Sequence, residues 1–345
     1  MERPVVIAGK ALVGEELELR PVTIVIADGM ITAIEDTTQA PDIWICPALF
    51  DAHTHLGDTV AMDCSTEGDL VDLVTPPDGL KHRLLNAASY TDIVAGMRAS
   101  IGEMVSRGTG GCADFREGGL EGVAALREAA LGQPFRCVIF GRDGGESNGD
   151  GLGVSSARDV VDLERIIADA KRKNKPVAIH AGEKDPGDVD AALAYEPDLI
   201  IHATHATDAQ LRECAERSIP VVVCPRSNWT LHTTTSSAHP PISRMLDLGC
   251  TVFLGTDNAM FVQPDLFAEM AFAHTIYKIH PSNVLRMAVA GSCLGGEPFF
   301  IREGARANFF SIDPRFSNLR FSKDPAASIV KRAVSGRIGT NVFIS

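Results

Sequence analysis

The stretch KPVAIHAGEKDPGDVDAALAYEPDLIIHATHATDAQLRECAERSIPVVVCPRSN, residues 175–228, decides the fold. It holds three short apolar runs, at 175–183, 198–207 and 219–228, and each run ends in polar residues. A helix-like or loop segment follows each of the first two runs, and in 207–218 apolar residues recur three and four positions apart. Strand-like runs that alternate with helical segments are typical of parallel β/α architectures.

The same alternation continues on both sides of this stretch. The chain has eight strand-like runs, at 44–56, 108–119, 135–145, 150–159, 175–183, 198–207, 219–228 and 250–260. Further helical patterns are clearest at 90–108, 121–132, 157–174, 242–250, 265–279 and 282–293. Eight strand–helix units over about 250 residues predict an α/β protein with a (β/α)8 TIM barrel. An open, doubly wound sheet has the same alternation and is the alternative.

The two ends of the chain have a different texture. Residues 5–36 predict two strands, a turn at Asp28-Gly29 and a returning strand, and the tail after residue 300 predicts short strands broken by Asp-Pro turns. Because the termini of a barrel lie at its surface, we expect both ends to join in one small composite β-sandwich. The predicted segments are 1–46 (N-terminal part of the sandwich), 47–300 (barrel) and 301–345 (C-terminal part).

Composition excludes several classes of partner. The chain of 345 residues carries 32 Lys and Arg against 45 Asp and Glu, a net charge of −13, which argues against a nucleic acid. No apolar run is long enough to span a membrane, and the N-terminus lacks the apolar stretch of an export signal. The eight cysteines form no CxxC pair, so we expect the protein to reside in the reducing cytoplasm. With nucleic acid and membrane argued against, a small-molecule substrate is the expected partner, and self-association is left open.

Side chains that can bind a metal or move protons lie at the ends of the first, fifth, sixth and eighth predicted strands. They are His53 and His55, His180 and Glu183, His202 and His205, and Asp257. In a TIM barrel the carboxyl ends of all strands meet at one face, so these residues are expected to converge there. The convergence favours the barrel over the open sheet. Imidazole combined with carboxylate suits zinc, iron or manganese.

Five stretches, PALFDAHTHL (47–56), AIHAGE (178–183), IIHATHAT (200–207), VVVCPRSN (221–228) and LGTDNA (254–259), resemble the amidohydrolase superfamily. The likeness is to its aminohydrolase branch of deaminases and chlorohydrolases, and it covers essentially the whole chain. The resemblance implies that His53, His55, His180 and Asp257 bind the metal. It also implies that Glu183 is the proton shuttle and that His202 contacts the metal-bound water. His205, three residues further on, is expected to pack or to support the site.

The number of metals follows from one departure from the superfamily. Many members hold two metals with a modified lysine on the fourth strand, but the fourth run here, DGLGVSSARD (150–159), contains no lysine. We therefore expect one divalent metal, zinc first and Fe(II) as the alternative, since both suit a site of three histidines and one aspartate.

Signals for substrate binding are fainter. Arg116, Arg142 and Arg226 each follow the end of a predicted strand and are candidates for holding an anionic group of the substrate. The alternative is that they pair with Glu117, Asp143 or other loop carboxylates. Asn228 is a further candidate for hydrogen bonding to substrate. The stretch PPDGLKHR (76–83) is either a lid over the pocket or a turn followed by the start of a helix.

The resulting hypothesis is a mononuclear metal-dependent hydrolase of non-peptide C–N bonds. It would deaminate an amino-substituted heterocycle, of purine, pyrimidine or pterin type, by metal-activated water, with Glu183, His202 and Asp257 as catalytic residues. One alternative is a ring-opening amidohydrolase resembling imidazolonepropionase. A second is an inactive barrel that serves as a binding protein, which predicts an eroded metal set. A third pattern, GxSxG at 145–149, occurs in a glycine-rich loop with no helix after it, unlike a true nucleophile elbow.

Overall fold

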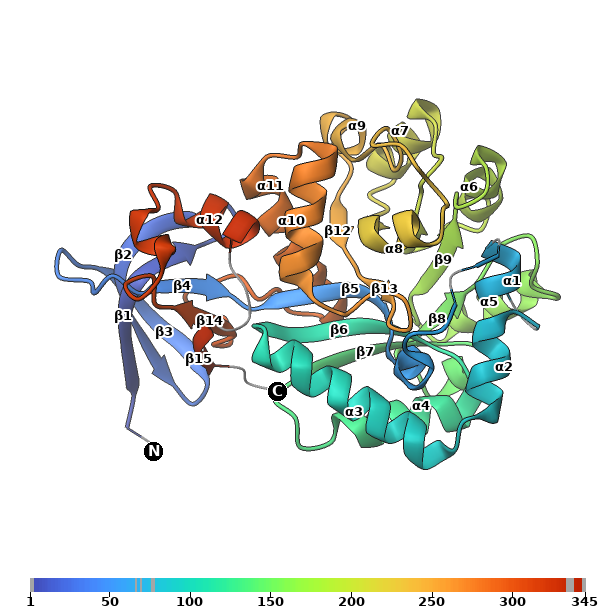
Figure 1. The fold of residues 1–345 in the computed structure, drawn as a ribbon, viewed down its shortest axis with the longest axis horizontal. Helices are drawn as coiled ribbons and strands as arrows, with labels where there is room; N and C mark the ends of the chain where they lie inside the picture. Colours follow the sequence, from blue (N-terminus) through green and yellow to red (C-terminus); the bar gives the residue numbers. More distant parts are fainter. Residues whose placement is uncertain (1–2, 66, 69, 76–77, 333–337, 343–345) are drawn as a thin grey trace.

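The computed structural model describes residues 3–65, 67–68, 70–75, 78–332 and 338–342. Its larger sheet consists of parallel strands, ordered β12-β11-β10-β9-β8-β7-β6-β5-β13 (Figure 1). These strands are β5 (Leu49–His55), β6 (Thr109–Arg116), β7 (Arg136–Gly141), β8 (Gly151–Val154), β9 (Val177–Ala181), β10 (Leu199–His202), β11 (Val221–Val223), β12 (Val252–Leu254) and β13 (Asp257–Asn258).

The sheet closes on itself through its last two strands. Gly255 and Thr256 alone separate β12, which pairs with β11, from β13, which pairs with β5, so the two are halves of one eighth strand. A Cβ atom added to Gly255 would lie 2.8 Å from the Cβ of His53, so only glycine allows this close approach. The predicted (β/α)8 barrel is confirmed.

The first predicted strand, 44–56, serves two sheets instead of one. Its first part, β4 (Trp44–Pro47), lies in the smaller sheet, and β5 begins the barrel. The backbone changes partner at Ala48, whose N–H donates to Asn308 in the tail, whereas the N–H of Leu49 donates to Gly108 next to β6. Both β4 and β5 are buried throughout, and therefore the hydrophobic pattern does not show where the strand passes from the smaller sheet to the barrel.

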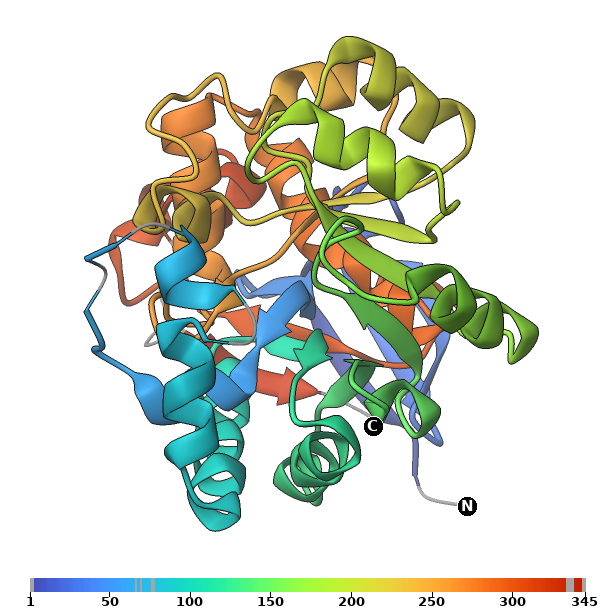
Figure 2. The same cartoon turned by 90° about the vertical axis from the view of Figure 1, so that its right-hand side faces the viewer.

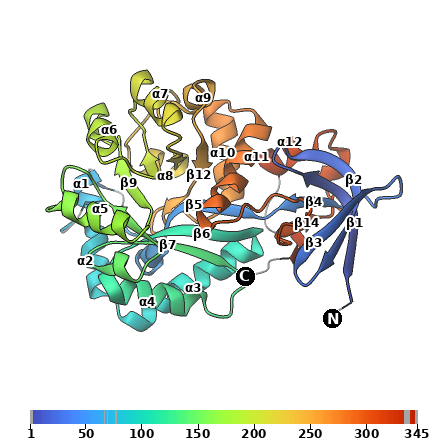
Figure 3. The same ribbon diagram turned by 180° about the vertical axis from the view of Figure 1, so that it is seen from behind.

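The smaller sheet joins the two ends of the chain, as Figure 3 shows from behind. Its strands, in the order β15-β14-β4-β1-β2-β3, are β1 (Val5–Val13), β2 (Glu18–Ala27), β3 (Met30–Asp36), β4, β14 (Phe309–Ile312) and β15 (Ile338–Val342). Asp28 and Gly29 both have positive φ, 50° and 77°, as a tight hairpin turn requires. This sheet fits the expected composite sandwich. The domain limits at 46/47 and 300/301 stay a prediction.

Helices surround the barrel strands (Figures 1 and 2). The helices that follow barrel strands or extend the last unit are α3 (Tyr90–Ser106), α4 (Gly119–Ala130), α5 (Leu163–Arg172), α6 (Pro186–Leu193), α7 (Asp208–Glu216), α8 (Pro225–Thr230), α9 (Ile242–Asp247), α10 (Leu266–Tyr277) and α11 (Pro281–Ala290). Two short helices, α1 (Leu70–Val74) and α2 (Leu80–Ala87), stand between β5 and α3. Short 3-10 turns lie at Leu56–Ala61, Gly145–Ser147, Gly291–Gly295 and Asn318–Phe321.

Two helices differ from the sequence prediction. The tail contains α12 (Pro325–Arg332), where strands and turns were predicted, because Asp324 accepts a hydrogen bond from the N–H of Ala327 and caps a helix that begins with proline. Helix α5 begins at Leu163 and not near residue 157, because Asp162 has a φ of +57°, in the left-handed region, which no right-handed helix can run through.

The core fills the barrel interior with large apolar side chains. Phe50, Phe115, Phe140 and Phe253 come from four different strands and are all at most 2% exposed. Within the described part of the chain, no helix combines the length and the apolar character that crossing a membrane demands. The barrel is therefore a packed scaffold whose polar groups concentrate at the carboxyl ends of its strands.

Candidate metal centre and active site

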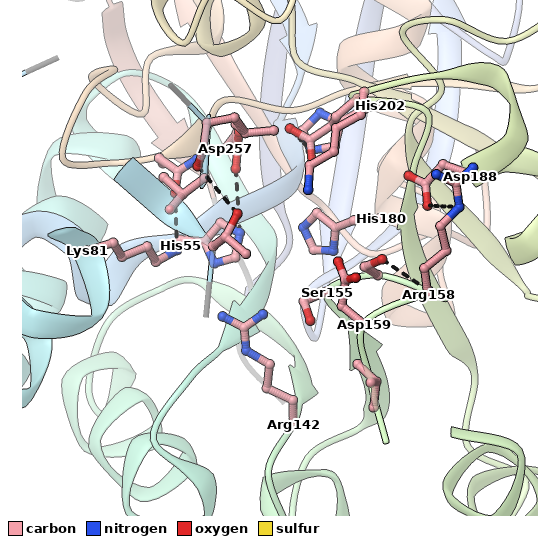
Figure 4. A pocket seen from close by; sticks show the side chains of 18 of the residues that line it. His55, Lys81, Arg142, Ser155, Arg158, Asp159, His180, Asp188, His202 and Asp257 are labelled. Carbon is pink, nitrogen blue, oxygen red and sulfur yellow. Dashed lines mark hydrogen bonds and ion pairs between the residues drawn. The ribbon is translucent and has the colours of Figure 1, made fainter. Parts of the chain in front are cut away.

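Four imidazoles and one carboxylate converge at the carboxyl ends of β5, β9, β10 and β13. The Nε2 atom of His53 lies 3.2 Å from Oδ1 of Asp257 and 3.3 Å from Nε2 of His180. The Nε2 atom of His55 lies 3.5 Å from the same carboxylate oxygen. Possible ligand atoms of two overlapping groups, His53 with His180 and His202, and His53 with His55 and Asp257, lie within 4.8 Å of one another. Figure 4 shows His55, His180, His202 and Asp257 turned toward a common centre.

In His180 and His55, the hydrogen bond made by Nδ1 determines whether Nε2 carries a proton or a free lone pair. Nδ1 of His180 lies 2.8 Å from the carbonyl oxygen of Val154, and Nδ1 of His55 lies 3.0 Å from that of Phe115. Carbonyl oxygens only accept, so both Nδ1 atoms carry the proton and both Nε2 atoms present a lone pair to the centre. Burial lowers the pKa of His180, and burial together with the charge of Lys81 lowers that of His55 to about 3, so both rings stay neutral.

The carboxylate of Asp257 is ionised and held in one orientation. Burial acts to raise its pKa, but the hydrogen bond with His53 and the neighbouring imidazoles keep the pKa well below the usual range. The hydroxyl of Ser227 donates to Oδ2 of Asp257 at 2.6 Å, which turns Oδ1 toward His53 and His55. Asp257 has a φ of +67°, a strained conformation for a residue other than glycine.

This donor set fits a divalent metal. The Nε2 lone pair of His55 lies 3.5 Å from the ionised carboxylate of Asp257, and that of His180 lies 3.3 Å from Nε2 of His53. Close approach of such electron-rich atoms is repulsive alone and attractive around a cation. In addition, Nδ1 of His53 and Nδ1 of His202 are buried without a hydrogen-bond partner among the described residues. Neutral imidazoles with one carboxylate are ligands that zinc and Fe(II) accept.

Asp51 links the strand that carries His53 and His55 to the strand that carries Asp257. Its carboxylate accepts from the backbone N–H and the hydroxyl of Thr256 at 3.0 and 2.6 Å, across 205 residues of sequence. The N–H of Thr256 also donates to the carbonyl oxygen of His53 at 3.1 Å, so the barrel closure and the cluster share one set of contacts. The side chain of Asp51 is fully buried, and it also accepts a hydrogen bond from the backbone N–H of His53 at 3.4 Å.

A cavity of about 500 Å³ opens over the cluster. His55, His180, His202 and Asp257 form its floor, and Glu183 lies beside them with Oε1 at 3.6 Å from Nε2 of His202. Burial raises the pKa of the Glu183 carboxyl, which favours a protonated group near the floor of the cavity. Such a carboxylic acid, next to a metal-type cluster, is suited to proton transfer.

Comparison with known proteins agrees with this geometry. The family model described as "Amidohydrolase family" matches residues 44–150, and the one described as "Adenosine deaminase" matches residues 148–293. A protein of Methanothermobacter thermautotrophicus that is named an aminohydrolase is 34% identical, over 98% of this chain and 97% of its own length. The chain belongs to the amidohydrolase superfamily.

A further relative is a deaminase, and a solved structure shares the fold of this amidohydrolase. The 5-methylthioadenosine/S-adenosylhomocysteine deaminase of Halobacterium salinarum is 27% identical, over 87% of this chain and 80% of the relative. A solved structure of an adenosine deaminase from Xanthomonas campestris, with bound zinc, has a TM-score of 0.82 at 17% identity and covers 96% of this chain and 90% of that chain. The protein is thus a hydrolase of carbon–nitrogen bonds other than peptide bonds, with a His/Asp metal-binding cluster.

The predicted substrate-binding residues of this amidohydrolase separate into two groups. Arg142 lines the cavity, although one of its nitrogens donates to Glu117 at 2.6 Å. The other three lie away from the cavity lining and have partners of their own. Arg116 pairs with Asp114 and Glu117, Arg226 with Glu269, and Asn228 donates to the hydroxyl of Thr204 at 2.8 Å. All three arginines therefore pair with carboxylates of the protein, as the alternative has it, and Arg142 lines the cavity as well.

The remaining sequence expectations have clear positions. His205 donates through Nε2 to the carbonyl of Thr233 at 3.0 Å and packs on His239, in agreement with a supporting role. Strand β8 has no lysine, and the nearby Lys175 donates to carbonyls of the loop before it. Ser147 of the GxSxG pattern is exposed and donates to the Gly144 carbonyl. In the stretch 76–83, helix α2 begins at Leu80, and residues 76–77 lie outside the described residues.

Two residues near the cluster, Lys81 and Glu117, were not expected from the sequence to be parts of the site. Lys81 comes from α2 and lines the cavity with only 2% of its surface exposed. Glu117 directly follows β6 and lies 2.8 Å from Nδ1 of His55. Burial acts to raise the pKa of Glu117, but Lys81, His55 and two arginines keep it well below the usual range. Glu117 follows a predicted strand, and that position was a signal for it; Lys81 has no such signal.

Replacing Ser227 by alanine is expected to weaken metal binding about 10- to 100-fold, because partners that orient a ligand contribute that much. The free Asp257 carboxylate could then rotate away from His53 and His55. Titration of the zinc-free protein with zinc in the presence of a competing chelator measures the effect. Thr230→Ala, which removes a hydroxyl from the same helix but not from Asp257, is the control. Equal affinities of Ser227→Ala and wild type would contradict the orienting role.

Proposed function

We propose that this amidohydrolase is a mononuclear zinc-dependent deaminase of an amino-substituted heterocycle, of purine type and similar to adenosine. The observation that carries the proposal is the position of Glu183. A carboxyl of raised pKa lies at the edge of a His/Asp cluster and faces the same cavity. The names of the relatives, 5-methylthioadenosine/S-adenosylhomocysteine deaminase and adenosine deaminase, support a purine over a pyrimidine or a pterin.

The metal would be held by His53, His55, His180 and Asp257, and it supplies Lewis-acid activation of water when bound. Zinc is favoured over Fe(II) because the adenosine deaminase with the similar fold carries bound zinc. His202 reaches the same centre from β10 and would orient the attacking water by a hydrogen bond. Oδ1 of Asp257, which Ser227 keeps turned inward, would accept the proton that the water loses.

Glu183 would supply the proton that the ring needs. As water adds to the carbon that bears the amino group, the adjacent ring nitrogen gains electron density and accepts the Glu183 proton. A second proton, passed from Asp257, converts the amino group into a leaving ammonia. As the ammonia leaves, the added hydroxyl gives its remaining proton to Glu183 and the carbon becomes a carbonyl. The sum is one water and one amine converted to one carbonyl and one ammonia, with both carboxyl groups restored to their initial states.

Among the candidate substrate residues, Arg142 is the one that we propose contacts substrate. It lines the cavity, and one NH2 group is committed to Glu117. Its other guanidinium nitrogens have no partner among the described residues and can bind a carboxylate or phosphate oxygen of the substrate. Leu70, Val74, Val160 and Val161 contribute apolar groups to the lining of the same cavity.

The first test is metal analysis combined with ammonia release. Purified enzyme is expected to hold about one equivalent of zinc per chain and to release ammonia from amino-purines, with activity lost after chelation and restored by zinc. Amino-pyrimidines and pterins serve as comparison substrates. Metal without ammonia from any amine would instead favour ring opening, as in imidazolonepropionase, which releases none. Absence of metal after reconstitution would overturn the metal centre and favour a binding protein.

A further inference from the structure

Lys81 occupies the wall of the cavity and has three acceptors within reach. Its Nζ lies 3.0 Å from Oδ2 of Asp58, 2.8 Å from Oε1 of Glu117 and 3.1 Å from Oδ1 of Asn258. The contact with Asn258 is a hydrogen bond, and the contacts with Asp58 and Glu117 are ion pairs with buried carboxyl groups. Lys81 is thus surrounded by polar groups of the protein, and its effect on a substrate would pass through the groups that it holds.

Asn258 is the group through which that effect reaches the substrate. It follows Asp257 directly and lines the cavity, and it is 4% exposed. Because lysine can only donate, the amide atom that faces Lys81 must be the oxygen. The amide NH2 then points the other way, and no described residue accepts a hydrogen bond from it. The cavity thus offers a fixed hydrogen-bond donor next to the metal cluster.

The ion pairs of Lys81 hold this arrangement in place. Asp58 and Glu117 come from the segments that follow β5 and β6, and both are buried. If Lys81 turned away, Asp58 would lose the cation paired with it in the protein interior, which is costly, whereas Glu117 would keep its pairs with Arg116 and Arg142. The orientation of the Asn258 amide is therefore determined by three separate parts of the chain.

We propose that Lys81 is a positioning residue that makes Asn258 a hydrogen-bond donor to the substrate, and that the enzyme consequently selects a heterocycle with an acceptor atom at that position. The acceptor is a ring nitrogen without hydrogen or a carbonyl oxygen. This inference rests on the proposed deamination of a purine-type ring. A ring that presents C–H to Asn258 leaves the amide donor without an acceptor, and a ring that presents N–H places two donors against each other. Both kinds of ring are disfavoured.

The test is a cycle between protein variants and substrate analogues. Adenosine, 3-deazaadenosine and 7-deazaadenosine differ by replacement of one ring nitrogen with C–H. For wild type, one deaza analogue is expected to have kcat/KM about 10- to 100-fold lower than adenosine, since an unpaired buried donor costs that much. In Asn258→Ala that ratio is expected to fall to about 1, while the ratio for the other analogue is unchanged.

Variants of Lys81 test the positioning step. Lys81→Met frees the amide to rotate, so the selectivity ratio is expected to fall as in Asn258→Ala. Asn258→Asp keeps the shape and the contact with Lys81 but presents an acceptor to the substrate, so it is expected to lose the preference for the ring nitrogen. This variant keeps the donor test available if Lys81→Met does not fold. Lys173→Met, at an exposed lysine on the far end of α5, is the matched control and is expected to keep the wild-type ratio.

The outcomes separate this inference from the proposed function. No ammonia from any of the three compounds with wild-type enzyme would refute the proposed purine deamination. Ammonia with equal losses for all analogues in Asn258→Ala would refute the contact between Asn258 and substrate. A wild-type ratio in a folded Lys81→Met, or in Asn258→Asp, would refute the positioning by Lys81. A merely structural role of Lys81 would lower kcat/KM for all analogues alike and leave their ratio unchanged.

Discussion

The variant His180→Ala is expected to lose its metal and to lower kcat/KM by about 10³-fold or more. His180 presents the lone pair of Nε2 to the centre of the cluster, 3.3 Å from Nε2 of His53, and its Nδ1 is held by the Val154 carbonyl. No other described side chain can replace that nitrogen from β9 without moving the strand. A bound metal contributes several kcal/mol to the stabilisation of a hydrolytic transition state, and about 1.4 kcal/mol corresponds to each tenfold in rate.

The matched control for this variant is His205→Ala. His205 lies three residues beyond β10, hydrogen-bonded to Thr233 and in contact with His239, so its loss is expected to leave the metal content unchanged. Both variants are measured by metal content per chain after gel filtration and by steady-state kinetics. A His180→Ala enzyme that retains one metal with wild-type affinity would show that the ligands lie elsewhere.

The variant Glu183→Gln is expected to reduce kcat by about 10²- to 10⁴-fold, the usual contribution of a positioned general acid or base. Glutamine has nearly the same shape, but it cannot deliver a proton to the ring nitrogen. Glu183 stands 3.6 Å from His202 and outside the two ligand groups of the cluster, so metal content is expected to stay at the wild-type value. KM is expected to change little, because the loss concerns a step after binding.

The distinction between kcat and metal content makes this second prediction specific. Glu164→Gln, at an exposed position in the first turn of α5, is the control for a general effect of losing one acidic group. Loss of metal from Glu183→Gln would assign Glu183 to the metal centre. An unchanged kcat would remove it from the proton transfer.

Residues at the ends of strands explain why much of the site could be predicted. His53 and His55 are two positions apart on a strand, and His180, His202 and Asp257 end other strands of a repeating pattern, so the barrel geometry alone brings them together. The helix and strand periods were also regular enough to predict the barrel units. The change of sheet at Ala48 was invisible because both sides of it are equally buried.

Interactions between distant side chains explain what could not be predicted. Lys81 belongs to a short helix in a connection, and its three partners lie on separate segments that only the folded chain brings together. Arg116 and Arg226 end up paired with Glu117 and Glu269, and the choice between a carboxylate of the protein and one of the substrate depends on distances that a sequence does not contain. An Asp-Pro pair such as Asp324-Pro325 suits both a turn and the start of a helix, and the packing of the folded chain decides which of the two forms.

The link from Asp51 to Thr256 has a consequence for how the molecule forms. These two residues are 205 positions apart, so the contact that joins the first barrel strand to the last closes a loop of more than half the chain. The proposed ligands on β5 and β13 come together only when that loop is closed. A metal bound by them would therefore stabilise the closed barrel over any form in which the first and last strands are apart.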